Sequence, residues 1–563
     1  MSEQQPPSGT PEYLEYGSGG PIPPAPIGEA PARRSRRAWW VGGGVVALLG
    51  VGAGAWAALS FFQQGAQPAE ALPSSTVGYL SVDLDPAGGQ KIDAFRTLNK
   101  FPAFKDDVGV NSVDELRHKL GEQLISDSGC SNLDYSRDID PWLGDRMAGA
   151  VVSLGSAQDP HLVAVVQVKN ESDARAGIAK IDACTDTGDN GVVVKDGWAI
   201  LAESQKVADE VSAATADGTL ADDATYQKWT KAVGDAGVVN AYASPDAGRV
   251  LTKELGGFLG GMFGEQVGTA VPGAAEGFAT SEPSAAATIS SAFIPATAGD
   301  DTVTGALAGF KGGAATLRFT GDGLELAMAG DGSSPELSPY SGTTGGELVG
   351  RLPDDTAAAI GISLQPGWFS RQADNLSLFS GGTSREDLYR EIKQQTGLDA
   401  PDDFETLLGS GIAFSVSKDI DLEAVENTDD GTGIPVAATV KGDPAAIEKV
   451  LDKLRLKIGD PAFAGSDSSD GRVAIGPTEE YRKRVLAGGD LGGSDAFTSV
   501  VPDAAHASAV FYVNIDALEP AFTKMMSGAD SRDLANLKPL RAIGMSTWTD
   551  GGVLRFSFKL TTN

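Results

Sequence analysis

The fold depends on a stretch that occurs twice, first as Leu72-Pro-Ser-Ser-Thr-Val-Gly-Tyr-Leu-Ser-Val-Asp-Leu84 and again as Leu352-Pro-Asp-Asp-Thr-Ala-Ala-Ala-Ile-Gly-Ile-Ser-Leu364. Each copy reads as a turn containing proline, followed by a strand with alternating apolar residues. Self-similarity over such a distance indicates that one structural unit is present twice in the chain.

Five further blocks repeat in the same order, which points to an internal duplication. They comprise two strand blocks, a charged helical run, a strand that leads into an amphipathic helix, and a β-hairpin with a glycine turn. The matched pairs are 166–174 with 438–446, 196–201 with 470–475, 205–214 with 479–486, 236–243 with 507–514, and 316–326 with 546–556.

Each copy mixes helices and strands, and several strands follow one another directly, such as 147–154 and 161–168. This order favours an α+β fold with mainly antiparallel sheets. We therefore expect two tandem related domains, the first at 63–335 with an insertion at 256–312 and the second at 336–563. At 563 residues the chain is long enough for domains of this size.

The N-terminal region predicts the cellular location of the protein. Residues 1–37 are rich in proline, are expected to be a disordered cytoplasmic tail, and end in four arginines, Arg33, Arg34, Arg36 and Arg37. Residues 38–62 carry no charge and would span about 37 Å as a helix, enough for a hydrocarbon core of about 30 Å. The positive-inside rule then predicts a single-pass cell-membrane protein with a cytoplasmic N-terminus and an extracytoplasmic bulk.

Other interpretations of this region stay open. Ala69-Glu-Ala71 resembles a signal-peptidase site, and Ser35-Arg-Arg37 is a weak match to a twin-arginine signal. Gly50 and Gly54 form a Gly-x-x-x-Gly pattern that makes a weak case for a dimer. The tail could bind a cytoplasmic partner through its prolines, or it could be a plain spacer.

Charge and composition exclude several classes of function. Lys and Arg number 44 against 76 Asp and Glu, a net charge of -32, which excludes nucleic acid as a partner because phosphate binding needs clustered cations. Two Cys and three His leave little material for a zinc site, so we expect no metal and no cofactor. Outside the cytoplasm, Cys130 and Cys184 are expected to form a disulfide, with two separate thiols as the alternative.

No residue pattern identifies an enzyme. The sequence contains neither His-Glu-x-x-His nor Gly-x-Ser-x-Gly, and His118, His161 and His506 stand apart from one another. We therefore expect no catalytic residues, although a dispersed triad of an extracytoplasmic hydrolase leaves no local signature. Paired aspartates at 83 and 85, 138 and 140, and 467 and 470 suit turns, with calcium binding as the alternative.

The insertion contains an unusual apolar stretch. Phe258, Leu259, Met262 and Phe263 would form one face of a helix interrupted by glycines. One interpretation is a lid or membrane-facing flap over an apolar groove. The alternative is a helix packed on its own sheet, or a low-complexity loop.

Two stretches carry a resemblance to a known family. The Leu-Pro-x-x-Thr-Val-x-Tyr-x-Ser-Val-Asp-Leu-Asp-Pro start at 72–86 and Asp140-Pro-Trp-Leu-Gly-Asp145, with the apolar span before them, resemble the bacterial membrane-anchored family that carries the domain of unknown function numbered 3352. The resemblance implies a single-pass envelope protein and no catalytic residues.

The expected function is that of a non-enzymatic binding or structural module of the bacterial envelope. Its expected partners are the membrane, and an apolar ligand or another envelope protein. A hydrolase, or an assembly or signalling protein that uses the proline-rich tail, is the alternative.

Overall fold

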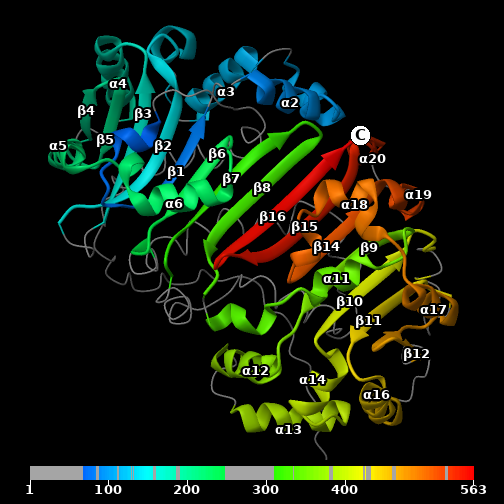
Figure 1. Cartoon of the computed structure of the whole chain (residues 1–563). Coiled ribbons are helices and arrows are strands. Elements are labelled where there is room, and N and C mark those ends of the chain that lie inside the picture. The colour runs from blue at the N-terminus through cyan, green and yellow to red at the C-terminus, as the bar shows by residue number, and fades with distance from the viewer. Residues whose placement is uncertain are drawn as a thin grey trace, which may run out of the picture. The chain divides into compact units, whose positions relative to one another are not determined.

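The computed structural model describes residues 67–83, 88–110, 113–127, 130, 132–155, 160–185, 190–247, 310–333, 335–379, 384–421, 425, 433–458, 465–525 and 531–563 (Figure 1). The strands of the first half are β1 (Thr76–Asp83), β2 (Leu143–Ser153), β3 (Pro160–Val168), β4 (Gly191–Lys195), β5 (Trp198–Ala202), β6 (Val239–Ala243), β7 (Gly313–Thr320) and β8 (Gly323–Asp331). Those of the second half are β9 (Thr356–Ser363), β10 (Gly411–Ser417), β11 (Val436–Lys441), β12 (Ser466–Ser469), β13 (Arg472–Ile475), β14 (Ala509–Asn514), β15 (Leu540–Asp550) and β16 (Val553–Thr562).

Within these residues the strands form one continuous sheet of sixteen strands, in the order β12-β13-β11-β10-β9-β14-β15-β16-β8-β7-β6-β1-β2-β3-β5-β4. All neighbouring strands run antiparallel. The predicted α+β fold with a sheet in each of two tandem domains is therefore corrected to a single sheet shared by both halves. Strand periodicity does not identify pairing partners, and the last strands of the two halves, β8 and β16, satisfy each other's backbone groups instead of remaining edges.

The two halves use the same strand order. Read outward from the β8–β16 junction, the first half runs 8-7-6-1-2-3-5-4 and the second runs 16-15-14-9-10-11-13-12. The strands of the repeated opening stretch, β1 and β9, hold equivalent places, as do the strands of the other matched blocks. The domain boundary near 335 stays a prediction.

A local twofold axis passes through the junction. The β7–β8 and β15–β16 hairpins both turn through two residues, and superposing the turns aligns Ala327 with Ser557. These two residues are also direct partners across the junction. Equivalent positions therefore face each other, as a twofold axis requires.

A buried carboxylate strengthens this junction. Glu325 on β8 accepts a 2.9 Å hydrogen bond from Arg318 Nε on β7 and a 3.2 Å bond from Ser557 Oγ on β16. Its Oε1 atom also lies 3.8 Å from Lys559 Nζ on β16. One side chain of the first half thus neutralises cations from both sides of the junction.

The first face of the sheet carries the two largest cores. In the first half it is covered by α5 (Gln205–Ala214) and α6 (Ala224–Val233), with buried Val207, Val211 and Trp229. In the second half α11 (Thr344–Gly350), α17 (Glu479–Ala487) and α18 (Asp495–Val500) do the same. Short helical turns complete this side, at η1 (Pro68–Ala71), η4 (Thr215–Asp217), η5 (Leu220–Asp222), η8 (Leu491–Gly493) and η9 (Ala504–His506).

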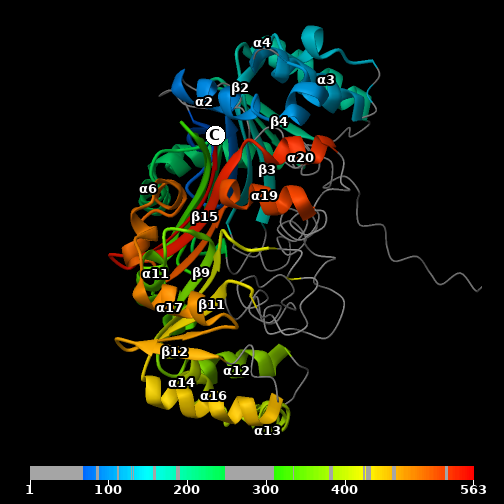
Figure 2. The same ribbon diagram turned by 90° about the vertical axis from the view of Figure 1, so that its right-hand side faces the viewer.

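The second face is covered mainly toward its two ends. Ile178 of α4 (Glu171–Thr185) and Ile447 of α16 (Pro444–Ile458) are buried there. Figure 2 shows α19 (Ile515–Met525) and α20 (Ser531–Leu537) on the opposite side of the sheet from α6, α11 and α17. The remaining helical elements are α2 (Gly88–Leu98), η2 (Phe104–Val108), α3 (Val113–Asp127), η3 (Tyr135–Ile139), η7 (Pro335–Tyr340), α12 (Trp368–Phe379), α13 (Arg385–Thr396) and α14 (Asp402–Leu408).

Turns and one sheet edge show the local chemistry that sets the strand ends. The equivalent hairpins β4–β5 and β12–β13 turn at Asp196-Gly197 and Asp470-Gly471, all four at positive φ, as a tight hairpin turn requires. On the edge strand β4, the Gln205 side chain accepts from Val192 N–H and donates to Val192 C=O. This amide occupies backbone groups that another strand would otherwise pair with.

The prediction of a transmembrane helix is also corrected. Among the described residues no helix is long and apolar enough to cross a membrane. The longest, α3, α4 and α16, have 15 residues each and reach about 22 Å, short of a hydrocarbon core of about 30 Å. The predicted span 38–62 lies outside the described residues, as do Arg33, Arg34, Arg36, Arg37, Gly50 and Gly54.

Candidate functional site

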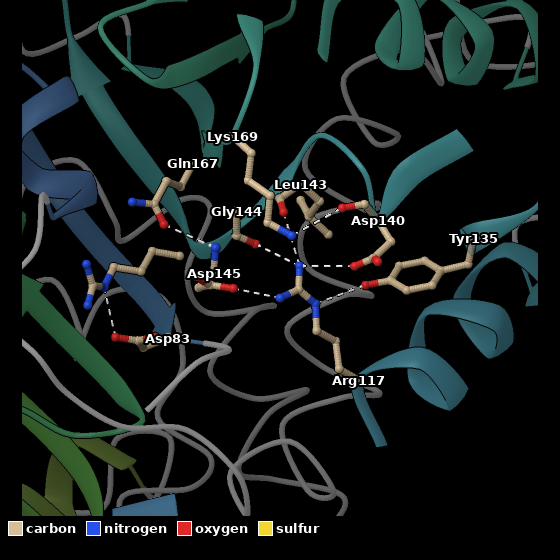
Figure 3. A network of polar contacts seen from close by, with 10 residues as sticks. Asp83, Arg117, Tyr135, Asp140, Leu143, Gly144, Asp145, Gln167 and Lys169 are labelled. Carbon is tan, nitrogen blue, oxygen red and sulfur yellow. Dashed lines mark hydrogen bonds and ion pairs between the residues drawn. The ribbon is translucent and has the colours of Figure 1, made fainter. Parts of the chain in front are cut away.

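A network of polar contacts joins α3 to the start of β2 (Figure 3). Arg117 on α3 donates from Nη1 to Asp145 at 2.6 Å, and from Nη2 to the carbonyls of Leu143 and Gly144 at 3.1 and 3.2 Å. Its Nε donates to the Tyr135 hydroxyl at 3.2 Å, and Nη2 lies 3.6 Å from Asp140. Each guanidinium nitrogen thus has a protein acceptor, so Arg117 holds the helix in place and is not available for a ligand.

Neighbouring groups extend this network into the sheet. Gln167 on β3 accepts from the Asp145 backbone N–H at 3.1 Å, and Lys169 donates to the Asp140 carbonyl at 3.3 Å. Arg146 donates to Asp83 at 2.9 Å, and both side chains are buried. The Asp140–Asp145 block that carries the family resemblance is therefore a structural joint between a helix and two strands.

A second buried carboxylate lies beside this joint. Asp138 is contacted by Arg137 Nη2 and Lys180 Nζ at 2.6 Å each, and accepts from the Asp134 backbone N–H at 3.1 Å. The bonds from Arg137, then Lys180, then Asp134 hold the pKa of Asp138 well below its usual range. Asp138 is therefore ionised at neutral pH, and its bond from Lys180 fastens α4 to the turn before β2.

The second half repeats this device. Asp403 accepts from the Asp399 backbone N–H at 2.7 Å and from Lys453 Nζ at 2.6 Å. Lys453 lies on α16, which follows β11 as α4 follows β3. This pair was not predicted, although the repeated pattern Leu-Asp-x-x-x-Asp at 133–138 and at 398–403 indicates it. Both halves contain this Lys–Asp contact at equivalent places. We therefore interpret it as part of the shared fold.

The predicted disulfide is present: Cys130 and Cys184 are bonded, with 5.7 Å between their Cα atoms. Beside it lies a pocket of about 320 Å³, lined by Asn132, Leu133, Arg137, Asp138, Lys180, Ala183 and Cys184. The two cationic side chains of this pocket, Arg137 and Lys180, already bind Asp138 and hold the turn in place. We assign no ligand to this pocket.

The histidines lie on separate parts of the structure. His118 contacts Ser136 through Nε2, and its Nδ1 is 3.5 Å from Glu122. His161 pairs with Glu203 at 2.8 Å, and His506 lies 3.9 Å from Asp503. The His118, Ser136 and Glu122 side chains have the order of a nucleophilic triad, but they lie at the surface and outside the pocket described above. Such exposed groups lack the desolvation that tunes catalytic side chains.

The paired aspartates mostly bind cationic side chains. Asp83 binds Arg146, Asp138 binds Arg137 and Lys180, and Asp467 binds Arg482 at 2.9 Å. Within the described part of the chain, no group of three or more His, Cys, Asp or Glu side chains is arranged to hold a metal ion. Asp85 lies outside this part.

The second face of the sheet carries apolar side chains that the described helices cover only in part. One row of directly paired residues crosses six central strands as Phe414, Ile360, Phe511, Met545, Phe558 and Leu326. The row continues on apolar residues to Ile475 on β13 and Val194 on β4. Along this face Leu162, Met328, Ile360 and Phe414 expose 39%, 46%, 40% and 44% of their surface.

The apolar surface predicted from the sequence is at another place. Phe258, Leu259, Met262 and Phe263 lie outside the described residues. The exposed residues of the sheet were missed because each strand reads as buried core. Only the pairing register shows that their side chains share one face.

Comparison with known proteins places the chain in one family. The described residues define an α+β protein with one sixteen-stranded antiparallel sheet, whose two halves have the same strand order. The chain belongs to the family described as Protein of unknown function (DUF3352), whose model matches residues 41–454. No curated protein and no solved structure matches it.

Proposed function

We propose that the protein is a non-enzymatic binding module that works outside the cytoplasm and holds an apolar ligand on the second face of its sheet. The observation that carries this proposal is the partial exposure of Leu162, Met328, Ile360 and Phe414 on one face. Single exposed apolar residues are normal on a protein surface, whereas a shared apolar face is typical of a binding surface.

The polar groups support a binding role over catalysis. The charged groups of Arg117 and Asp138 are both bound by protein groups in a structural joint. Among the described residues the His118–Ser136 contact favours a hydrolase, but its surface position argues against that alternative.

The chemistry of the face suggests the class of ligand. The row from Leu326 to Phe414 contains only apolar side chains and runs straight across the strands, which suits a linear hydrocarbon such as a fatty-acyl chain. Adjacent strands are about 4.8 Å apart, so the six strands of this row extend over about 24 Å. The net charge of -32 disfavours a strongly anionic head group.

The disulfide supports the proposed location. Disulfides persist in oxidising compartments and are rare in the cytosol. Cys130 is buried and Cys184 lines the small pocket beside it, so the bond belongs to the folded structure of the first half. An extracytoplasmic position would keep it oxidised.

The test measures binding of a fluorescent fatty-acyl probe to the full-length protein. Phe414 and Ile360 each expose somewhat under half of their surface, so covering each contributes about 1 kcal/mol. Replacing both, as Phe414→Ser with Ile360→Ser, should weaken binding roughly 30-fold. Leu456→Ser is the matched control, because Leu456 is 89% exposed on α16. Equal weakening by the control, or no binding to the unchanged protein, would refute the proposal.

A further inference from the structure

We propose that the outer edge of β12 binds an extended, positively charged segment of another protein as one more antiparallel strand. β12 is the terminal strand of the sheet in the second half, and among the described residues it pairs with β13 alone (Figure 1). The site is an edge of the sheet, so the proposal does not rest on an apolar ligand bound to the second face.

The backbone groups of Ser466 and Ser468 point away from β13. The Gly476 N–H donates to the Gly465 carbonyl at 3.0 Å, so the hydrogen-bonded pairs of this hairpin fall on the odd-numbered residues of β12. In an antiparallel ladder these pairs alternate with residues whose N–H and C=O groups point to the other side. Ser466 and Ser468 therefore offer two donors and two acceptors to a further strand.

The equivalent edge in the first half is closed by side chains. Gln205, the first residue of α5, accepts from the N–H of Val192 at 3.1 Å and donates to its carbonyl at 3.3 Å. Arg175 of α4 donates to the carbonyl of Val194. Counted back from the Asp-Gly turns, these two valines hold the places in β4 that the outward-facing serines hold in β12.

In the second half both capping positions carry acidic side chains. Glu479 is the first residue of α17, the place that the capping glutamine holds in α5. Glu448 follows the N-cap residue of α16 by five residues, as the capping arginine does in α4. Glu479 bonds to Lys483, and Glu448 accepts from the Ser466 hydroxyl at 2.7 Å. An ionised carboxylate has no proton to donate, so neither side chain can cover a carbonyl of β12.

β12 also lacks the residues that protect many exposed edges. It reads Ser-Asp-Ser-Ser at 466–469, without the lysine or proline that commonly blunts an edge strand. Its one charged side chain, Asp467, is directed to α17, where it accepts from Arg482 at 2.9 Å. The end of the strand and its turn, residues 468–470, are exposed. A further strand can therefore approach this edge.

Charge indicates the kind of partner. The cationic side chains that bond to β12, Arg455 and Arg482, are ion-paired with Glu448 and Asp467. The exposed Asp470 carboxylate at the turn has no ion pair within the described residues. A net charge of -32 makes two copies of this chain repel each other and attracts a cationic segment. Addition of an extended peptide to an exposed edge is a general mode of recognition, with main-chain hydrogen bonds supplying the affinity.

Fluorescence anisotropy with the full-length protein and a labelled nonapeptide of alternating lysine and valine tests this proposal. Glu479→Gln places on α17 the amide that caps β4, and should weaken binding about tenfold by occupying the Ser466 backbone groups. Glu480→Gln is the matched control, because it removes the same charge from a side chain about 100° further around the helix. It should change binding by less than about threefold. Ser468→Pro removes an outward N–H at an edge position that tolerates proline, and should weaken binding about tenfold.

Amide hydrogen exchange locates the bound peptide. Exchange in residues 465–469 should slow about fivefold when the peptide binds, while exchange in β4 should not change. Equal binding by Glu479→Gln and the unchanged protein, or protection confined to other strands, would overturn the proposal. Equal affinity for a nonapeptide of alternating glutamate and valine would refute the cationic partner. A dimer that forms without peptide and dissociates in Ser468→Pro would identify a second copy of this chain as the occupant instead.

Discussion

Replacing Glu325 with alanine should destabilise the protein by about 3 kcal/mol, because it removes the counter-charge at the junction of the two halves. Glu325 is 7% exposed and contacts Arg318, Ser557 and Lys559. Removing one member of a buried ion pair costs about 3–5 kcal/mol, since the remaining charge stays buried without its partner. The lower end applies here because Arg318 keeps its bonds to two backbone carbonyls, and both cationic side chains keep some contact with solvent.

Urea unfolding of the full-length protein, followed by tryptophan fluorescence, measures this loss. Glu325→Gln keeps an acceptor for Ser557 and should cost only about 1–2 kcal/mol. Glu479→Gln is the control, because Glu479 forms an exposed pair with Lys483 and its loss should leave the free energy of unfolding unchanged within error. A loss below about 1 kcal/mol for Glu325→Ala, or equal losses for all three variants, would contradict the reasoning.

Three further predictions address single elements of the first half. Replacing Cys130 and Cys184 with serine should lower the free energy of unfolding by about 4 kcal/mol, measured against the oxidised protein in the same denaturant series, because the bond closes a loop of 54 residues. Arg117→Met should speed amide hydrogen exchange in α3 at least tenfold while exchange in α16 is unchanged, since only α3 loses its joint to β2. Burial raises the pKa of Tyr226 to about 12 from an ordinary value of 10, so its contribution to stability is complete below pH 10 and is lost as pH rises toward 12. An absorbance titration of tyrosinate should show that Tyr226→Phe lacks one group that ionises near pH 12 in the folded protein.

Much of the fold follows from local pattern. The alternating strands at 76–83 and 356–363, the Asp-Gly hairpin turns and the disulfide are all readable from residues close in sequence or from cysteine count. The strands depend on alternation of apolar residues, the turns on positive φ, and the disulfide on the oxidation state of two cysteines. Each of these is a property of a few residues. Such properties can be recognised without knowledge of the tertiary structure.

The pairing of β8 with β16 and the candidate site were not readable in this way. A strand's sequence shows which residues alternate. It does not show which strand will be its neighbour or in which register the two will pair. Met328 and Phe414 read as core residues, and only the assembled face shows that they are exposed. Arg117 likewise reads as a surface charge on a polar helix, because its acceptors come from residues 18–28 positions away.

The direct pairing of Ala327 with Ser557 has a consequence for the origin of the protein. Two identical copies of a single half could pair their last strands in the same register, since a twofold axis maps this junction onto itself. The ancestor of the duplicated gene would then have been an isologous homodimer, and gene fusion would have replaced an assembly of two chains with one. Two halves in one chain need not remain identical, and the disulfide between Cys130 and Cys184 lies in the first half alone.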